Sequence, residues 1–487
     1  MAFDLNKYIS VEIPLFFMFV NFLLTNTLFT NLIVYRTCYI ILGYNKTACA
    51  ELGNDNVNIV DKNQTEALDK LVVPTADIIT MVKTTVESLF PVFVCMVAGP
   101  WSDKHGRKPV LLMSLIGLTV GSALVVIFSI FDSINPWYFL IASIPPMVTG
   151  GVTTYYAATL SYLTDVSTDE TRGLRMACYE GALACGVLIG SIASPYIFDA
   201  TNYETVFAIG CACMLISLAY MIFFIPESLN TNKSNENSSS SSVGTEDRKL
   251  IQLQNFKDMV ITTFKNRGEH KRTLLLIAIL STAILGFLTT GDTGIQYLFF
   301  TERFDWNFKM YSLYNSFYYI FWIIGTMGGT YFLHKLLKIR DTILTLVGLV
   351  SYMISYIIMV IARNNYLIYS AGVVRCLGGL VLPMLRSHIS RIVPADEMGK
   401  IFAVLVGGTA LISLGASPLY TMVYNATIDT NSSLYNLVSI CLIGIVMVFT
   451  IIMMCLEPRQ TYSLVGADSE RSLLTEDLGQ PQINAEM

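Results

Sequence analysis

Glu180 and Arg386 are the charged residues whose surroundings point most clearly to chemistry in this 487-residue chain. Each adjoins long apolar stretches, where an ionisable side chain is costly unless it faces a cavity or a partner. Because burial favours the neutral form of a carboxyl group, a buried Glu180 could take up and release protons. Two structural alternatives stay open: Glu180 pairs with Arg172 or Arg175 at the membrane rim, and Arg386 extends its head group to the membrane edge.

Three further charged or titratable residues lie inside apolar stretches. Asp292 falls between Gly291 and Gly294, where we expect the helix to break, so Asp292 could bind a substrate amine or a proton. The imidazole of His388 can titrate near neutral pH and is a candidate for proton coupling, with a packed, hydrogen-bonded histidine as the alternative. We expect Arg375 to make a structural ion pair.

A charged pair and several tyrosines complete the candidates. Lys83 and Glu87 are four residues apart and share one helix face, either as a self-neutralising pair or as substrate contacts. Most tyrosines should pack in the core or at the membrane interface, whereas Tyr156 and Tyr297 are candidates for stacking on a ring-bearing substrate. The sequence shows no metal-ligand cluster, nucleotide-binding loop or nucleophile motif, so we expect neither an enzyme nor a bound cofactor.

The elements that must position these residues are membrane-spanning helices. A composition with 53% hydrophobic and 14% charged residues leaves too little polar surface for a water-soluble domain, and the dispersed basic residues argue against nucleic-acid binding. Because a bilayer core requires about 20 apolar residues per helix, the sequence predicts an all-α membrane protein with twelve transmembrane helices in two six-helix bundles. The predicted spans are 11–35, 76–99, 109–131, 137–164, 176–198, 204–225, 273–299, 310–334, 342–362, 366–393, 401–424 and 434–456.

Loop charges predict the orientation of these helices. Lysines and arginines are concentrated in stretches that should be cytosolic, as both termini should be: 101–109, 165–175, 226–272 and 334–341. Four sequons in the external loops are predicted glycosylation sites: Asn45, Asn63, Asn425 and Asn431. The chain divides into an N-terminal bundle at 1–229 with a glycosylated loop at 36–75, a cytosolic linker at 230–272, a C-terminal bundle at 273–457 and a cytosolic tail at 458–487.

A short basic loop, Gly99 to Pro109, joins the second and third predicted helices. Its spacing, G-x-x-x-D-K-x-G-R-K, resembles the signature loop of major facilitator transporters. Gly106 permits a tight turn, and Asp103 can sit at a helix end. By this resemblance, Asp103 and Arg107 match positions that are important for the conformational cycle. The alternative is an ordinary basic loop between two helices.

Further segments make the resemblance more specific. The loop and three other segments resemble solute carrier family 46, the family of the proton-coupled folate transporter and its lysosomal relatives: Asp165-Val-Ser, Arg175-Met-Ala-Cys-Tyr-Glu180 and Leu385-Arg386-Ser-His-Ile-Ser-Arg391. This resemblance implies a major facilitator fold and a secondary active transporter that moves a small organic solute together with protons. It also implies that Glu180 takes part in proton coupling and that Arg386 binds an acidic substrate.

The chain departs from the folate carriers at several positions. An acid and an arginine on the fourth helix of those carriers correspond to Gly151 and Ser143. The family's disulfide joins the first and fourth external loops, yet the loop near 300–309 has no cysteine. Cys38 and Cys49 lie near the first loop, and the sequence leaves open whether they pair. These departures favour the amphipathic organic anions and breakdown products associated with the lysosomal branch.

The C-terminal tail offers a sorting signal. Tyr462 and Val465 fit the Y-x-x-Φ motif that clathrin adaptors bind, which favours a late endosomal or lysosomal membrane over the plasma membrane. The expected partners are a small organic molecule, protons and membrane lipids. The alternative functions are folate or pterin uptake at the cell surface and a receptor that binds a ligand without moving it.

Overall fold

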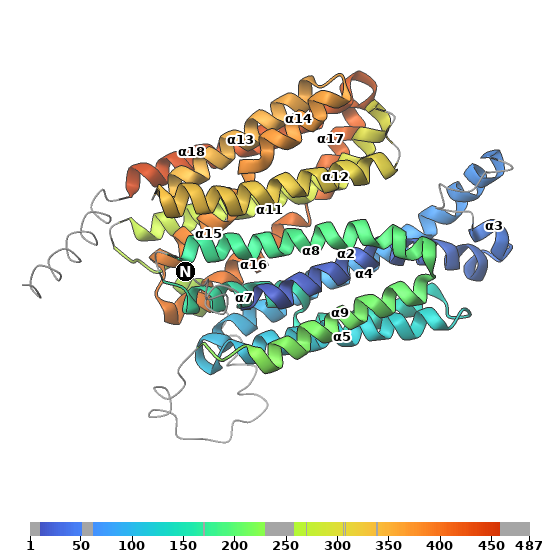
Figure 1. Cartoon of the computed structure of the whole chain (residues 1–487), viewed down its shortest axis with the longest axis horizontal. Coiled ribbons are helices and arrows are strands. Elements are labelled where there is room, and N and C mark those ends of the chain that lie inside the picture. Colours follow the sequence, from blue (N-terminus) through green and yellow to red (C-terminus); the bar gives the residue numbers. More distant parts are fainter. Residues whose placement is uncertain are drawn as a thin grey trace, which may run out of the picture.

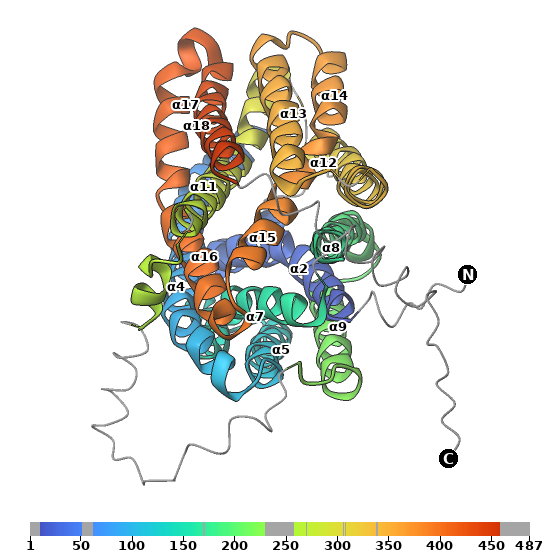
Figure 2. The same cartoon turned by 90° about the vertical axis from the view of Figure 1, so that its left-hand side faces the viewer.

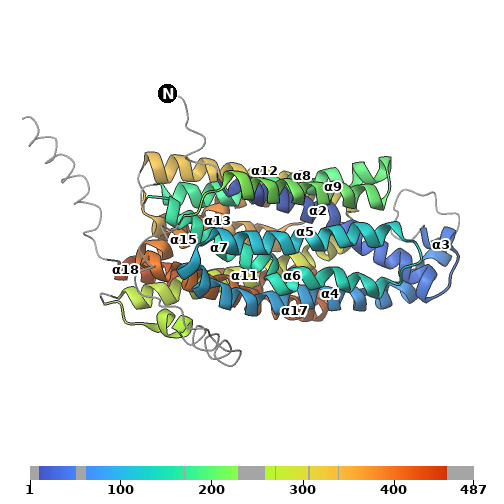
Figure 3. The same ribbon diagram turned by 90° about the horizontal axis from the view of Figure 1, so that it is seen from below.

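The computed structural model of the chain describes residues 10–50, 62–168, 171–228, 258–268, 270–304, 306, 308–337 and 339–457. These residues form long helices that run along one common axis (Figures 1 and 3). Ten helices of the described part are long and apolar enough to cross a membrane. Seen along that axis, the helices form two groups with α15 (Val381–Ile392) between them (Figure 2). The predicted all-α fold with two six-helix bundles is confirmed, and the chain is an integral multi-pass membrane protein.

The N-terminal bundle is built from long helices and shorter connecting turns. Its elements are α2 (Glu12–Arg36), η1 (Thr37–Ile41), α3 (Lys46–Ala50), α4 (Lys62–His105), α5 (Lys108–Ile130), η2 (Pro136–Ser143), α6 (Ile144–Thr149), α7 (Gly151–Val166), α8 (Arg172–Ala200) and α9 (Tyr203–Phe224). The side chain of Asn202 accepts a hydrogen bond of 3.1 Å from the Thr205 amide and so caps the start of α9.

The C-terminal bundle contains more interrupted helices. Its elements are α11 (Lys271–Phe304), α12 (Phe308–Ile323), η4 (Ile324–Gly328), η5 (Thr330–Leu336), α13 (Asp341–Ile361), α14 (Asn365–Val374), η6 (Arg375–Leu380), α15, η7 (Ala395–Glu397), α16 (Met398–Ser413), α17 (Ala416–Asn431), η8 (Ser432–Leu434) and α18 (Tyr435–Leu456). Asn364 caps α14 through a 3.1 Å bond from the Leu367 amide.

Several predicted spans differ in form from the observed helices, among them the fourth and the second. The fourth span is divided into η2, α6 and α7, because Gly150 and Gly151 take positive φ angles of 84° and 47° that only glycine adopts readily. The second span, predicted at 76–99, is the longer helix α4. Asn63 therefore lies in the first turn of a helix rather than in a loop, and its side chain is outside the described part.

The other predicted glycosylation sites have different settings. Asn45 is exposed just before α3, and Asn425 is exposed on α17, which continues past the predicted end of its span. Asn431 is the last residue of α17, with a side chain outside the described part. The linker predicted at 230–272 is described only at 258–268 and 270–272, and the tail with Tyr462 and Val465 lies outside the described residues.

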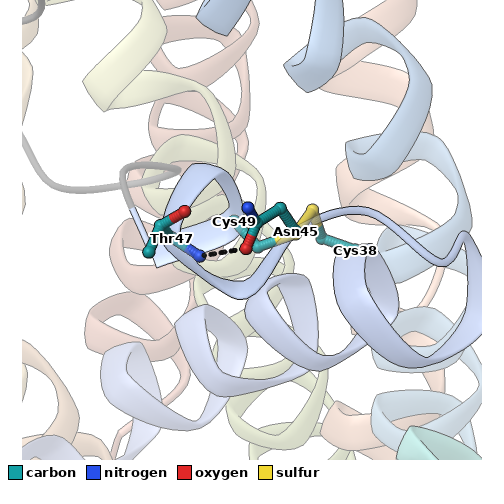
Figure 4. Close-up of a disulfide and its surroundings, with 4 residues drawn as sticks. All are labelled: Cys38, Asn45, Thr47 and Cys49. Atoms are coloured by element: carbon teal, nitrogen blue, oxygen red, sulfur yellow. Dashed lines mark hydrogen bonds between the residues drawn. A yellow bond between two sulfur atoms is a disulfide. The ribbon is translucent and has the colours of Figure 1, made fainter.

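A disulfide closes the loop that follows α2, which the loop charges predict to be external. Cys38 and Cys49 are bonded, with their Cα atoms 5.7 Å apart, and the ring they close contains Asn45 and Thr47 (Figure 4). The Asn45 side-chain oxygen accepts a bond of 3.3 Å from the Thr47 amide. Nearby, the buried Arg36 guanidinium donates to the carbonyls of Phe128 at 2.9 Å and Ser129 at 2.7 Å. Arg36 thus holds the carboxyl end of α5 beside the end of α2.

Candidate functional site

Glu180 and Arg386 form an ion pair between the two bundles. Glu180 lies on α8 of the N-terminal bundle, and Arg386 lies on α15 of the C-terminal bundle. The Arg386 Nη1 atom contacts the Glu180 Oε1 atom, and both side chains are buried. A buried charge requires a close partner, because burial removes the water that would otherwise stabilise it. The pair therefore ties the bundles together as long as both groups are charged.

Tyr156 of α7 completes this central site. Its hydroxyl donates to Glu180 Oε1 at 2.6 Å and accepts from Arg386 Nη1 at 3.0 Å. The Arg386 guanidinium also stands over the Tyr156 ring, 5.1 Å from the ring centre. The ring of Tyr179 packs against Tyr156 at 5.2 Å. The site therefore joins one acid, one cation and two aromatic rings, which can hold a proton, an anion and an apolar group.

The structure shows neither of the two alternatives for Glu180 and Arg386, a pair between Glu180 and Arg172 or Arg175 and an Arg386 head group at the membrane edge. Arg175 pairs instead with Glu12, 3.3 Å from Nε to Oε1, and donates to Ser10 Oγ at 2.8 Å. Arg172 donates to the Ser390 carbonyl at 3.3 Å. Arg386 is buried rather than extended to the membrane edge.

Asp292 lies in a separate cluster inside the C-terminal bundle. Its Oδ2 atom accepts a bond of 2.8 Å from the Tyr356 hydroxyl and lies 3.4 Å from Arg375 Nη1. Arg375, as expected, makes a buried ion pair, and its guanidinium faces the rings of Tyr352 and Tyr356 at 4.7 Å each. The structure does not place Asp292 beside Glu180 or Arg386.

The predicted helix break at Asp292 is wrong. Helix α11 continues through Gly291, Asp292 and Gly294 to Phe304. Gly291 packs directly against the ring of Tyr420, so its small size permits close packing of α17 rather than a break.

The remaining predicted residues also stand apart from the central site. The ring of Tyr297 packs against Tyr311 at 5.1 Å. His388 Nδ1 is 3.7 Å from Glu457 Oε1. Lys83 Nζ and Glu87 Oε2 are 2.7 Å apart in the predicted helical pair, whose other carboxylate oxygen accepts a 2.6 Å bond from Ser143.

A second cluster surrounds Arg107 at the end of the bundles that the loop charges predict to be cytosolic. The Arg107 guanidinium bonds Asp103 Oδ1 at 2.5 Å, Asp165 Oδ2 at 3.0 Å and Ser102 Oγ at 2.8 Å. Burial by itself would lower the pKa of Arg107, but the adjacent carboxylates of Asp103 and Asp165 raise it above the ordinary value. Arg107 is thus held charged at the centre of this cluster, which we name the cytosolic gate after its predicted side and predicted role.

Asp103 connects this cluster to the C-terminal bundle. Its two carboxylate oxygens accept bonds from the amides of Gly399 at 2.8 Å and Lys400 at 3.0 Å, in the first turn of α16. A carboxylate at this position satisfies free N–H groups and complements the positive helix end. The helices approach closely, since a Cβ atom on Gly99 would lie 2.5 Å from that of Ala403. The predicted helix-end position of Asp103 is therefore seen, at the end of a helix remote in sequence.

Sequence reasoning missed two parts of the gate. Glu227 accepts bonds from the amides of Arg107 at 2.8 Å and Lys108 at 3.1 Å, which caps α5. Glu397 pairs with Lys265 and Arg267 at 2.7 Å each, linking the segment before α11 to α16. In the sequence, Glu227 and Glu397 each follow the end of a predicted span and lie on the same predicted side of the membrane as the basic loops. This position was the signal that could have indicated their ion pairs and helix caps.

Comparisons with known proteins show the family and the fold of this chain. The Major Facilitator Superfamily model matches residues 75–418. A Drosophila melanogaster protein described as probable peptidoglycan muropeptide transporter SLC46 is 30% identical over 86% of this chain and 80% of its own length. The chain belongs to solute carrier family 46. As a member of this family it is a membrane solute transporter and not an enzyme.

Two other similar proteins extend the comparison for this solute carrier family 46 chain. The Mus musculus lysosomal proton-coupled steroid conjugate and bile acid symporter SLC46A3 is 24% identical over 67% of this chain and 69% of its own length. The crystal structure of the human organic anion transporter MFSD10 (TETRAN) matches 93% of this chain and 100% of that protein, with a TM-score of 0.68 and 14% identity. The latter likeness concerns the fold.

Proposed function

We propose that this solute carrier family 46 protein is a proton-coupled symporter that carries an amphipathic organic anion of the muropeptide class into the cytosol. The observation that supports this most strongly is the Glu180–Arg386 pair, since it joins an acid of one bundle to a cation of the other. An exchange of partners at this pair would link proton binding to bundle movement.

The coupling follows from competition for Arg386. In the present state, the Glu180 carboxylate neutralises the Arg386 guanidinium. A proton that binds Glu180 removes that negative charge and leaves Arg386 in need of an anion. The substrate carboxylate takes the place of the Glu180 charge, and the neutral Glu180–substrate complex can then change conformation. On the cytosolic side, the proton leaves Glu180, the ion pair forms again and the substrate departs.

The substrate class rests on chemistry and on the named relatives. Arg386 supplies a cation for an acid, while the rings of Tyr156 and Tyr179 supply an apolar surface beside it. Muropeptides, which the Drosophila relative's name gives as its substrate, combine carboxylates with less polar groups. Folate uptake is the second candidate, but by the resemblance described above Gly151 and Ser143 replace the acid and the arginine expected in folate carriers. We propose that Asp292 and Tyr297 shape the same cavity from α11 when the bundles open, and that His388 assists proton movement.

We further propose a lysosomal or late endosomal location. The mouse relative is described as lysosomal, and Tyr462 with Val465 offers a motif for clathrin adaptors. An acidic lumen would supply the protons that the symport requires. Glycans on the predicted external asparagines would then face the lumen, and membrane lipids would cover the apolar outer helix surfaces.

Purified protein in proteoliposomes tests the proposed transport. Radiolabelled muramyl dipeptide should accumulate inside vesicles when the outer solution is acidic, and a proton ionophore should abolish that accumulation. Empty vesicles are the control. Saturable binding without uptake would identify a receptor instead, and uptake of labelled folate in preference to the muropeptide would favour the second candidate.

A further inference from the structure

A buried polar cluster lies on the cytosolic side of the Glu180–Arg386 pair, and its central histidine belongs neither to the proposed substrate site nor to the cytosolic gate. Its centre is His334 of η5, a histidine that sequence reasoning did not consider. His334 Nε2 is 2.8 Å from Asp341 Oδ1 at the start of α13. Arg391 Nη2 lies 3.5 Å from the other oxygen of Asp341. Both His334 and Asp341 are buried.

The cluster extends to a second histidine. His388 of α15 faces Glu457, with 3.7 Å between Nδ1 and Oε1, and Glu457 Oε2 accepts a bond of 3.1 Å from Thr342. The Ser387 hydroxyl, next to Arg386 in the chain, faces Asp341. The ends of η5, α15 and α18 and the start of α13 therefore bring two imidazoles and two carboxylates together.

The position of His334 places this cluster in line with Glu180. The His334 ring lies directly against Gly173 of α8, where an added Cβ atom would be 2.8 Å from Cε1. Gly173 and Glu180 are seven residues apart and share one face of α8. At 1.5 Å per residue, His334 therefore stands about 10 Å on the cytosolic side of Glu180. On α15, His388 likewise lies closer than Arg386 to the predicted cytosolic end of the helix.

Each imidazole has one nitrogen toward a carboxylate and one left over. Among the described residues, His334 Nδ1 and His388 Nε2 are buried without a hydrogen-bond partner. The open nitrogen of a neutral imidazole is a hydrogen-bond acceptor at which a proton can bind. The other charges around the cluster are Arg391 on α15, Arg172 beside Gly173 on α8, and Arg340 directly before Asp341.

We propose that His334, held by Asp341 and assisted by His388 and Glu457, is the group that releases the transported proton to the cytosol. This inference rests on the proposed proton symport. The Glu180 carboxyl O–H bond breaks, its electron pair stays on Glu180 to restore the pair with Arg386, and the proton reaches His334 Nδ1 through water. The His334 imidazolium then loses that proton to cytosolic water. The separation of about 10 Å requires water between the two groups, since it exceeds a hydrogen bond.

Substitution of His334 by glutamine distinguishes a proton relay, in which His334 passes on the proton from Glu180, from a purely structural role of the ring. His334→Gln keeps a hydrogen-bond donor for Asp341 but cannot titrate. In proteoliposomes, this variant should exchange muramyl dipeptide between the two sides almost as wild type does. Its accumulation driven by a pH gradient should fall by roughly tenfold or more, and its exchange rate should lose dependence on cytosolic-side pH. His270→Gln, which changes an exposed histidine directly before α11, is the matched control and should behave as wild type.

Three outcomes would count against the relay. Wild-type accumulation and pH profile in His334→Gln would overturn it while leaving the symport intact. Loss of accumulation in His334→Ala together with full recovery in His334→Gln would show that the ring serves only to hold Asp341. A wild-type protein that shows no gradient-driven uptake would reject the proposed symport itself and this inference with it. A pH-sensitive dye inside the vesicles provides the independent record of proton movement.

Discussion

The Asp103 carboxylate of α4 accepts a 2.8 Å hydrogen bond from the backbone amide of Gly399, in the first turn of α16. The two residues belong to opposite bundles and are 296 positions apart. Arg107 holds the same carboxylate from the other side. The signature loop therefore joins the two bundles, at the end predicted to be cytosolic, by capping a helix of the other bundle. A transport cycle that opens this end must break that cap.

The first prediction concerns this cap. Asp103→Ala should weaken the closed state by about 1.5–3 kcal/mol, the usual contribution of a hydrogen bond to a charged group. We expect uptake in vesicles to fall by about tenfold or more, because each 1.4 kcal/mol shifts a conformational equilibrium tenfold. Asp132→Ala removes an exposed carboxylate that pairs with Lys46 and serves as the control. Undiminished uptake by folded Asp103→Ala would show that the cap is dispensable.

The second prediction concerns Glu180. Glu180→Gln imitates the protonated form and cannot neutralise Arg386. The variant should lose gradient-driven accumulation of muramyl dipeptide but retain exchange between equal concentrations. Both rates are measured in the same proteoliposomes, with Glu204→Gln at the start of α9 as a control outside the site. Accumulation at the wild-type level would transfer the coupling role to Asp292 or His388.

The third prediction concerns Arg386. Arg386→Lys keeps the charge but loses the planar guanidinium that faces the Tyr156 ring and bonds its hydroxyl. We expect the Michaelis constant for the substrate to rise by about tenfold, while the protein remains folded and delivered to membranes. Initial rates over a range of substrate concentrations give this constant. An unchanged Michaelis constant would place substrate recognition elsewhere, with the Asp292–Arg375 cluster as the next region to test.

The fourth prediction concerns the external face. Joint substitution of Asn45, Asn63, Asn425 and Asn431 by Gln should remove the gel shift that glycosidase treatment produces in the wild type. Asn45 and Asn425 should each give part of the shift, because both are exposed. Single variants measured beside the joint one assign the contributions. A shift that survives and maps to Asn232 or Asn237 would reverse the assigned orientation.

The fifth prediction concerns the disulfide between Cys38 and Cys49. Cys38→Ser should lower the free energy of unfolding of the external region by about 2–3 kcal/mol, because the bond closes a short loop. Thermal unfolding with and without reductant measures this loss, which should be absent in Cys441→Ser.

The proposed sorting signal in the tail has its own test. If the protein is in lysosomes, as proposed, Tyr462→Ala should move it to the cell surface, as seen by surface labelling. Unchanged distribution would indicate another sorting signal.

Much of the fold could be predicted because it depends on local composition. Apolar stretches long enough to cross a bilayer identified the helices, and the basic loops indicated their orientation. The positions of Glu180, Arg386, Asp103 and Arg107 drew attention for the same reason, since a charge in or beside an apolar stretch is visible in one sequence. Local composition misled at Asp292, where two glycines suggested a break but serve helix packing.

The partners of these charges were decided only by the tertiary structure. Glu180 had arginines close to it in the chain, yet it pairs with Arg386, 206 residues away. His334 gained a candidate role only because η5, α8 and α13 place Gly173 and Asp341 beside its ring. Hydropathy determines which segments enter the membrane, because each segment meets the bilayer with its own side chains. A buried charge instead pairs with whichever group the packed helices bring within hydrogen-bond distance, and that choice belongs to the whole chain.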